Sequence, residues 1–129
     1  MPADRQVTTA PDAPAAIGPY SHAVRSGGLL FISGQVPIDP ATGKLVEGDI
    51  AAQTRRCLEN LRAVCAAAGA DLADAVRCGI YVTDMGKFAE VNAAYAEFFA
   101  EKPPARSTIG VAALPLGAEV EIDAIVAVG

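Results

Sequence analysis

The chain has 129 residues, with 10 Lys and Arg against 15 Asp and Glu, and a net charge of −5 at neutral pH. This length suits a single domain spanning residues 1–129. The negative charge disfavours contact with phosphate backbones, so we expect no nucleic-acid partner. No apolar run approaches the ~18 residues that a membrane span requires. The first five residues also lack the basic start and apolar stretch of a signal peptide.

Cysteine and histidine usage indicates a reducing compartment and no metal site. Cys57, Cys65 and Cys78 are odd in number and form no C-x-x-C pair, which suits free, buried thiols in a cytoplasmic protein. His22 is the single histidine, too few ligands for a typical structural zinc site. A hydrolase triad of His22 with Ser21 or Ser33 is disfavoured because nothing resembling G-x-S-x-G is present.

The first half of the chain predicts a loop, a hairpin and a helix. Prolines and a glycine interrupt residues 8–21, which predicts a loop. The turn signal at 26–28 lies between apolar runs at 22–26 and 29–36 and predicts a hairpin. Both alternating faces of the second run are apolar, so we expect both to be covered. After a turn-rich loop at 37–48, Asp49 predicts the cap of a helix that runs to about residue 68.

The second half predicts a strand, a helix and two further strands. Residues 76–83 alternate with period two, with Val76, Cys78, Ile80 and Val82 on one face. Asp84 predicts the cap of a helix over about 85–101, which Pro103-Pro104 would end. Its apolar stripe is expected to comprise Phe88, Val91, Tyr95 and Phe98. The last strands, about 106–113 and 119–126, are expected to be joined directly through residues 114–118.

Two amphipathic helices can cover only one face of a sheet, so these elements predict a two-layer α+β domain. The other face would be solvated, or covered by a second copy packing sheet to sheet. The residues expected on that uncovered face are Arg77, Tyr81, Thr83, Arg106, Thr108, Glu119, Glu121 and Asp123.

Two residues of this face are candidates for chemistry. Arg106 is either a surface charge or a bidentate clamp for a carboxylate, because its planar guanidinium matches two oxygens. Glu121 could orient a water molecule or move a proton. If a turn near Leu116 joins the last two strands, Glu121 pairs with Val111. The two side chains then start roughly 15 Å apart. Long reach, a register shift or a neighbouring subunit would be needed to bring them into one site.

Several motifs resemble the RidA (YjgF) family over nearly the whole chain. They are Ile17-Gly18-Pro19-Tyr20-Ser21-His22-Ala23, Phe31-Ile32-Ser33-Gly34-Gln35-Val36-Pro37, residues 53–61, residues 91–99, Pro104-Ala105-Arg106-Ser107 and Val120-Glu121-Ile122. The resemblance implies a chorismate-mutase-like fold, with a mixed sheet of about six strands and two helices on one face. It also implies a homotrimer with clefts between subunits.

For function, the resemblance implies hydrolysis of reactive enamines and imines to 2-oxo acids and ammonia without a cofactor. The substrates would be 2-aminoacrylate, 2-iminopropanoate and 2-iminobutanoate. Arg106 would hold the substrate carboxylate and Glu121 would position or activate water. The cleft would be lined by Tyr20, Ser33, Gly34, Asn92 and Thr108.

Two departures from the family pattern matter. Asp123 stands where the family often has glutamate, and Thr108 stands where many members carry cysteine, so thiol-based activities do not transfer to that position. The alternative function is a non-enzymatic, carboxylate-binding trimer that acts as a regulator or chaperone. Ribonuclease activity, also ascribed to the family, fits poorly with a net charge of −5.

Overall fold

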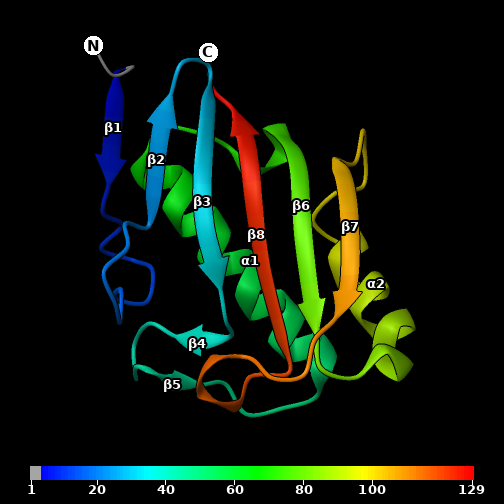
Figure 1. Ribbon diagram of the computed structural model, residues 1–129. Coiled ribbons are helices and arrows are strands. Elements are labelled where there is room, and N and C mark those ends of the chain that lie inside the picture. Colours follow the sequence, from blue (N-terminus) through cyan, green and yellow to red (C-terminus); the bar gives the residue numbers. More distant parts are fainter. Residues whose placement is uncertain (1–3) are drawn as a thin grey trace.

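The computed structural model describes residues 4–129 and consists of a six-stranded sheet with both α-helices on one face (Figure 1). Residues 1–3, part of the segment used to argue against a signal peptide, lie outside the described residues. The sheet strands are β1 (Arg5–Thr8), β2 (Ala23–Ser26), β3 (Leu29–Gln35), β6 (Ala75–Val82), β7 (Ala105–Gly110) and β8 (Val120–Ala127). The α-helices are α1 (Ile50–Ala67) and α2 (Phe88–Ala96). The predicted two-layer α+β class is confirmed.

The expected direct pairing of the last two strands is wrong. The strand order is β1-β2-β3-β8-β6-β7, so β8 lies antiparallel between β3 and β6. β7 instead pairs in parallel with β6, to which α2 connects it, and forms the edge of the sheet. Glu121 therefore lies opposite Tyr81 and not opposite Val111.

Helix α1 matches the prediction and α2 is shorter than predicted. The Asp49 carboxylate accepts a hydrogen bond from the Ala52 N–H at 2.9 Å and caps α1. Asp84 caps a 3₁₀ turn, Met85–Lys87, that precedes α2. Helix α2 ends at Ala96, because the following N–H groups bond three residues back and tighten the turn. This tightening buries Phe99, at 7 % exposed, where Phe98 was expected.

Two short features were not predicted from the sequence. Strand β1 precedes the N-terminal loop, and β4 (Ile38–Asp39) pairs with β5 (Lys44–Leu45) in a small separate sheet. The Asn60 side chain, fully buried on α1, donates hydrogen bonds to the carbonyls of Val36 and Ile38 and ties this region to the helix. Within residues 4–129, no helix has the length and apolarity needed to cross a membrane.

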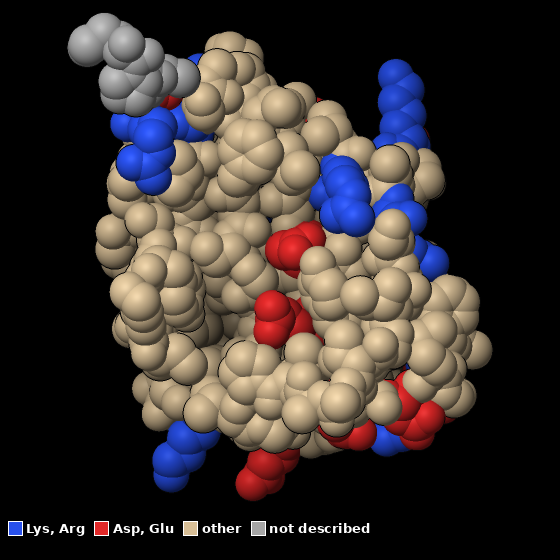
Figure 2. Space-filling view, viewed as in Figure 1, with Lys and Arg blue, Asp and Glu red and all other residues tan. Residues whose placement is uncertain are grey.

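The sheet face away from the helices is called the open face here, and its centre combines apolar residues with two acids. Leu30 and Ile32 are buried beneath α1, whereas Leu29 and Phe31 on the open face are 37 % and 44 % exposed. Figure 2 shows acidic atoms near the middle of this face, within largely uncharged surroundings.

Val76 is also exposed, so its predicted place in the core is wrong. A bulge between Ala75 and Arg77 shifts the register and turns Ala75 inward instead.

Candidate functional site

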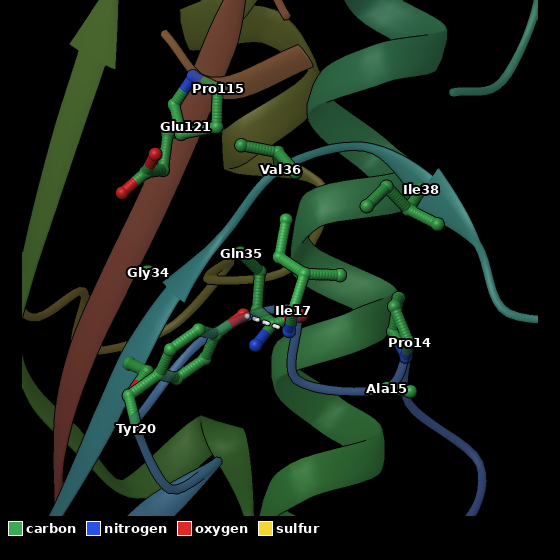
Figure 3. A pocket seen from close by; sticks show the side chains of 11 residues that line it. Pro14, Ala15, Ile17, Tyr20, Gly34, Gln35, Val36, Ile38, Pro115 and Glu121 are labelled. Atoms are coloured by element: carbon green, nitrogen blue, oxygen red, sulfur yellow. Dashed lines mark hydrogen bonds between the residues drawn. The ribbon is translucent and has the colours of Figure 1, made fainter. Parts of the chain in front are cut away.

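The predicted site residues form two separate groups. The first surrounds a cavity of about 310 Å³, called the Glu121 cavity here (Figure 3). Tyr20, Ser33, Gly34 and Glu121 line it. Its remaining wall is mostly apolar and consists of Pro14, Ala15, Ile17, Gln35, Val36, Ile38 and Pro115.

Gly34 allows the Glu121 side chain to lie against the backbone of β3. A bulge between Ile32 and Gln35 lets two residues of β3 face one residue of β8. A Cβ atom at Gly34 would overlap Glu121 Oε2 and would lie 2.9 Å from its Cδ. The absence of a side chain is therefore what makes room for the carboxylate.

Hydrogen bonds fix the surroundings of this cavity. Ser33 Oγ donates to the Ser21 carbonyl at 2.6 Å, and the Ser33 N–H donates to the His22 carbonyl at 2.9 Å. The Tyr20 hydroxyl accepts from the Ile17 N–H at 3.4 Å, the bond drawn in Figure 3. These contacts hold the loop before β2 against β3.

The Glu121 carboxyl has a raised pKa, first because it is partly buried and second because Asp123 lies beside it. Both acids point to the open face, since they are two residues apart on β8. Asp123 is held in place: it accepts hydrogen bonds from the Tyr81 hydroxyl at 2.9 Å and from the Gly79 N–H at 3.0 Å. A raised pKa makes a carboxylate a stronger proton acceptor, which suits Glu121 to general base catalysis.

The second group, called the Arg106 seam here, lies between β7 and α2. The guanidinium carbon of Arg106 is 4.9 Å from the ring centroid of Tyr95 and 5.7 Å from that of Phe88. Asn92, Tyr95 and Arg106 help to line a second cavity, of about 370 Å³. None of the ion pairs found among residues 4–129 involves Arg106.

The Arg106 seam also contains unused hydrogen-bonding capacity. Three buried side-chain atoms in residues 4–129 have no hydrogen bond of good geometry: Asn92 Oδ1, Thr108 Oγ1 and Tyr95 Oη, of which the last lies beside the Cys78 thiol. Buried polar atoms without partners are uncommon and costly, so a cluster of three beside a cation calls for an explanation. A polar, negatively charged ligand or ordered water would provide one.

The expectation that Arg106 and Thr108 share a face with Glu121 is wrong. Arg106 is in register with Cys78, which is buried on the helix side, whereas Glu121 is in register with Tyr81 on the open face. Counting three residues along the strand and two strand spacings, the Cα atoms of Arg106 and Glu121 lie roughly 14 Å apart. Because their side chains point to opposite sides of the sheet, one chain does not unite them in one site.

Glu119 also departs from the expected face. It accepts hydrogen bonds from Lys87 and Gln53 on the helix side. The expected open-face positions of Arg77, Tyr81, Glu121 and Asp123 are confirmed by their register in the sheet.

Sequence reasoning did not assign Asp123, Tyr81 or Tyr95 to a site. Asp123 could have been assigned from its spacing in Glu121-Ile122-Asp123, because alternate residues of a strand share a face. Tyr81 follows from the pairing of β6 with β8, and the stacking of Arg106 on Tyr95 from the packing of α2 on β7. Neither arrangement has a local sequence signature.

The cysteines are free and buried, as predicted. Burial is the main cause of a raised pKa at all three, and it brings the pKa of Cys65 to about 12. Among residues 4–129, no group of three or more His, Cys, Asp and Glu side chains is placed to hold a metal ion.

Comparison with known proteins agrees with this fold. The family described as "Endoribonuclease L-PSP" matches residues 10–128. A 2-iminobutanoate/2-iminopropanoate deaminase of Salmonella typhimurium is 47% identical over 117 residues, covering 88% of this chain and 91% of that protein. Protein DfrA of Myxococcus xanthus is 53% identical over 123 residues, covering 94% of each chain.

The crystal structure of RidA from an Antarctic Psychrobacter has a TM-score of 0.91 and 42% identity, and the match covers 95% of this chain and 99% of that one. The chain therefore belongs to the RidA/L-PSP family, as its motifs indicate.

Replacing Asp123 should lower the pKa of Glu121. Asp123→Asn removes the neighbouring negative charge that opposes ionisation of Glu121 and keeps an oxygen that can accept from Tyr81. Carbon-13 NMR titration of the Glu121 carboxyl should show ionisation at lower pH than in the wild type. Asp74→Asn, in the short 3₁₀ turn Leu72–Asp74, serves as the control and should leave the titration unchanged. An unchanged or higher Glu121 pKa in Asp123→Asn would contradict the electrostatic account.

Proposed function

We propose that this protein hydrolyses reactive 2-imino acids and their enamine tautomers to 2-oxo acids and ammonia. The observation that carries the proposal is the Arg106 seam: a guanidinium held over two rings, without an ion-pair partner in residues 4–129, beside three unpaired buried polar atoms. This is a suitable receptor for a small carboxylate. The deaminase name of the Salmonella typhimurium relative supports the same chemistry.

In the proposed reaction, Arg106 binds the substrate carboxylate and Glu121 positions a water molecule. The water adds to C2 of the protonated imine, and Glu121 accepts the proton that the water loses. The resulting tetrahedral intermediate has one hydroxyl and one amino group on C2. Glu121 then returns the proton to the nitrogen. The C–N bond breaks, ammonia leaves, and the C2 hydroxyl gives up its proton as the C=O bond of the 2-oxo acid forms. One protonated imine and one water therefore give one 2-oxo acid and one ammonium ion.

Little activation is needed, because a protonated imine carbon is already electrophilic. Holding the water and the substrate close together in the reactive orientation can lower the activation free energy by several kcal/mol. The raised pKa of Glu121 suits a group that accepts a proton in one step and returns it in the next. Tyr20, Ser33 and Gly34 would shape the cavity beside it, and Asn92 and Thr108 would complete the carboxylate end.

We propose further that the protein is a homotrimer whose reaction site lies between subunits. Arg106 and Glu121 point to opposite sides of one sheet, so bringing both to one substrate requires two chains. The exposed apolar residues Leu29, Phe31 and Ile109 on the open face also favour a cover by a second copy. In this arrangement the Arg106 seam of one subunit meets the Glu121 cavity of the next.

Neither other candidate function has comparable support. Endoribonuclease activity, named in the family description, would place phosphates next to Glu121 and Asp123 on a chain of net charge −5. A trimer that binds carboxylates without catalysis would use Arg106, but it would not require an acid with a raised pKa at Glu121.

Substitution of Arg106 should reduce turnover and preserve assembly. Arg106→Ala removes a charge-assisted pair with the substrate, typically about 1.5–3 kcal/mol, or roughly tenfold to more than a hundredfold in kcat/KM. Arg106→Lys keeps the positive charge but lacks the planar guanidinium that bonds both carboxylate oxygens. It should therefore recover only part of the wild-type kcat/KM. The assay is 2-oxo acid formation from 2-iminopropanoate generated in situ. Wild-type rates in a folded Arg106→Ala protein would contradict the mechanism and favour the binding role.

A methyl group at Gly34 should displace Glu121. Gly34→Ala introduces a Cβ into the volume of the Glu121 carboxylate and should cost about tenfold to a hundredfold in kcat/KM, because catalytic groups tolerate little misplacement. Gly28→Ala is the matched control, since its Cβ would meet only the Val128 carbonyl oxygen at 3.6 Å. Equal activities in the two variants would rule out the close approach as a requirement.

The assembly can be tested by mass. Light scattering at micromolar concentration should give three times 13.2 kDa. Phe31→Glu, which places a charge on the apolar open face, should shift the mass toward that of a monomer and abolish imine hydrolysis with it. Full activity in a protein of monomer mass would show that one chain suffices.

A further inference from the structure

His22 belongs to neither group of site residues, yet both nitrogens of its ring are engaged. The side chain is buried, at 5 % exposed. Nδ1 accepts a hydrogen bond from the Ala10 N–H at 2.8 Å, and Nε2 lies 2.8 Å from the Pro14 carbonyl oxygen. A carbonyl only accepts, so Nε2 carries the proton and Nδ1 does not. The contacts therefore select one neutral tautomer of His22.

These two bonds hold the segment that forms one side of the Glu121 cavity. Pro14, Ala15 and Ile17 come from this segment and line the cavity, next to Tyr20 (Figure 3). The same segment also lines a further hollow, together with His22 itself. Ala15 and Tyr20 therefore line both cavities.

The wall segment has few other attachments. Residues 15–20 are all exposed, and only Ala10 and Ala13, at 2 % and 6 % exposed, anchor the segment in the core. Within the described part of the chain, the hydrogen bonds that connect residues 9–17 to the remainder are the two of the His22 ring and a longer one from the Ile17 N–H to the Tyr20 hydroxyl in the same loop. The position of the wall therefore depends on the imidazole more than on packing.

We propose that His22 is a positioning residue that fixes residues 9–17 as the apolar wall against which the substrate side chain packs. The inference rests on the proposed function for its substrate, a 2-imino acid with an aliphatic side chain. The wall presents apolar groups, above all Ile17, to that side chain. Loss of the two bonds lets the wall move away from Glu121, which weakens substrate binding more than it slows the chemical step.

The test compares two substitutions of His22 with a control substitution elsewhere in the same segment. Glutamine offers one acceptor and one donor, as the neutral imidazole does, whereas leucine offers neither. His22→Leu should raise KM for the imine derived from leucine about five- to tenfold, the effect of losing one or two neutral hydrogen bonds, with kcat within about twofold. His22→Gln should restore most of the wild-type KM. Asp12→Asn, an exposed position of the same segment, is the control and should leave KM unchanged.

A spectroscopic measurement separates this inference from the proposed reaction. Nitrogen-15 NMR of the wild-type ring should show a protonated Nε2 and a bare Nδ1, and the Ala10 amide should exchange slowly in the wild type and rapidly in His22→Leu. If His22→Leu does not fold, His22→Asn, whose shorter amide cannot reach both partners, takes its place in both experiments. A wild-type KM in folded His22→Leu, or in the folded His22→Asn that replaces it, would overturn the proposal. Rapid exchange of the Ala10 amide in the wild type would overturn it as well. Slow Ala10 exchange in a wild-type protein without imine hydrolysis would instead contradict the proposed function alone.

Discussion

Strand β8 is hydrogen-bonded on both edges, to β3 on one side and to β6 on the other, and the rest of the structure depends on this central position. Its inward residues Val120, Ile122, Ala124 and Val126 are almost fully buried beneath the helices. Alternation then places Glu121 and Asp123 on the open face. The register that builds the core therefore also places the acids, and a slip of one residue would exchange the two sets.

The central position of β8 leaves β7 at the edge of the sheet, paired only with β6. The connection through α2 brings Phe88 and Tyr95 over the side chain of Arg106. A cation and a carboxyl that both suit one small substrate thus lie on opposite sides of the same sheet. The proposed trimer would bring the two groups together without changing the fold of any one chain, and it would also cover the apolar residues of the open face.

The two acids near the Glu121 cavity each lie against a glycine of a neighbouring strand. Gly34 provides the space in which the Glu121 carboxylate lies, and Gly79 does the same for Asp123, whose Oδ1 would be 2.6 Å from an added Cβ. Partial burial, and secondarily the negative charge of Asp123, raise the pKa of Glu121. His22 acts indirectly. It does not line the cavity, but its two hydrogen bonds hold the loop that forms one wall of it.

The sequence by itself determined the elements whose signals are local. The Asp49 cap, the helical spacing of α1, the turn at Gly27 and Gly28 and the period-two pattern of β8 each depend on residues close in the chain, and the motifs around Tyr20, Ser33, Arg106 and Glu121 identified the family. Only the tertiary structure decided that β8 lies between β3 and β6, that Arg106 faces α2 and that a bulge turns Val76 outward. It also decided that the His22 ring is hydrogen-bonded to Ala10 and Pro14. These outcomes depend on pairing and packing between residues far apart in the chain. Periodicity shows that a strand has two faces, but the neighbouring strands and helices decide which face is buried.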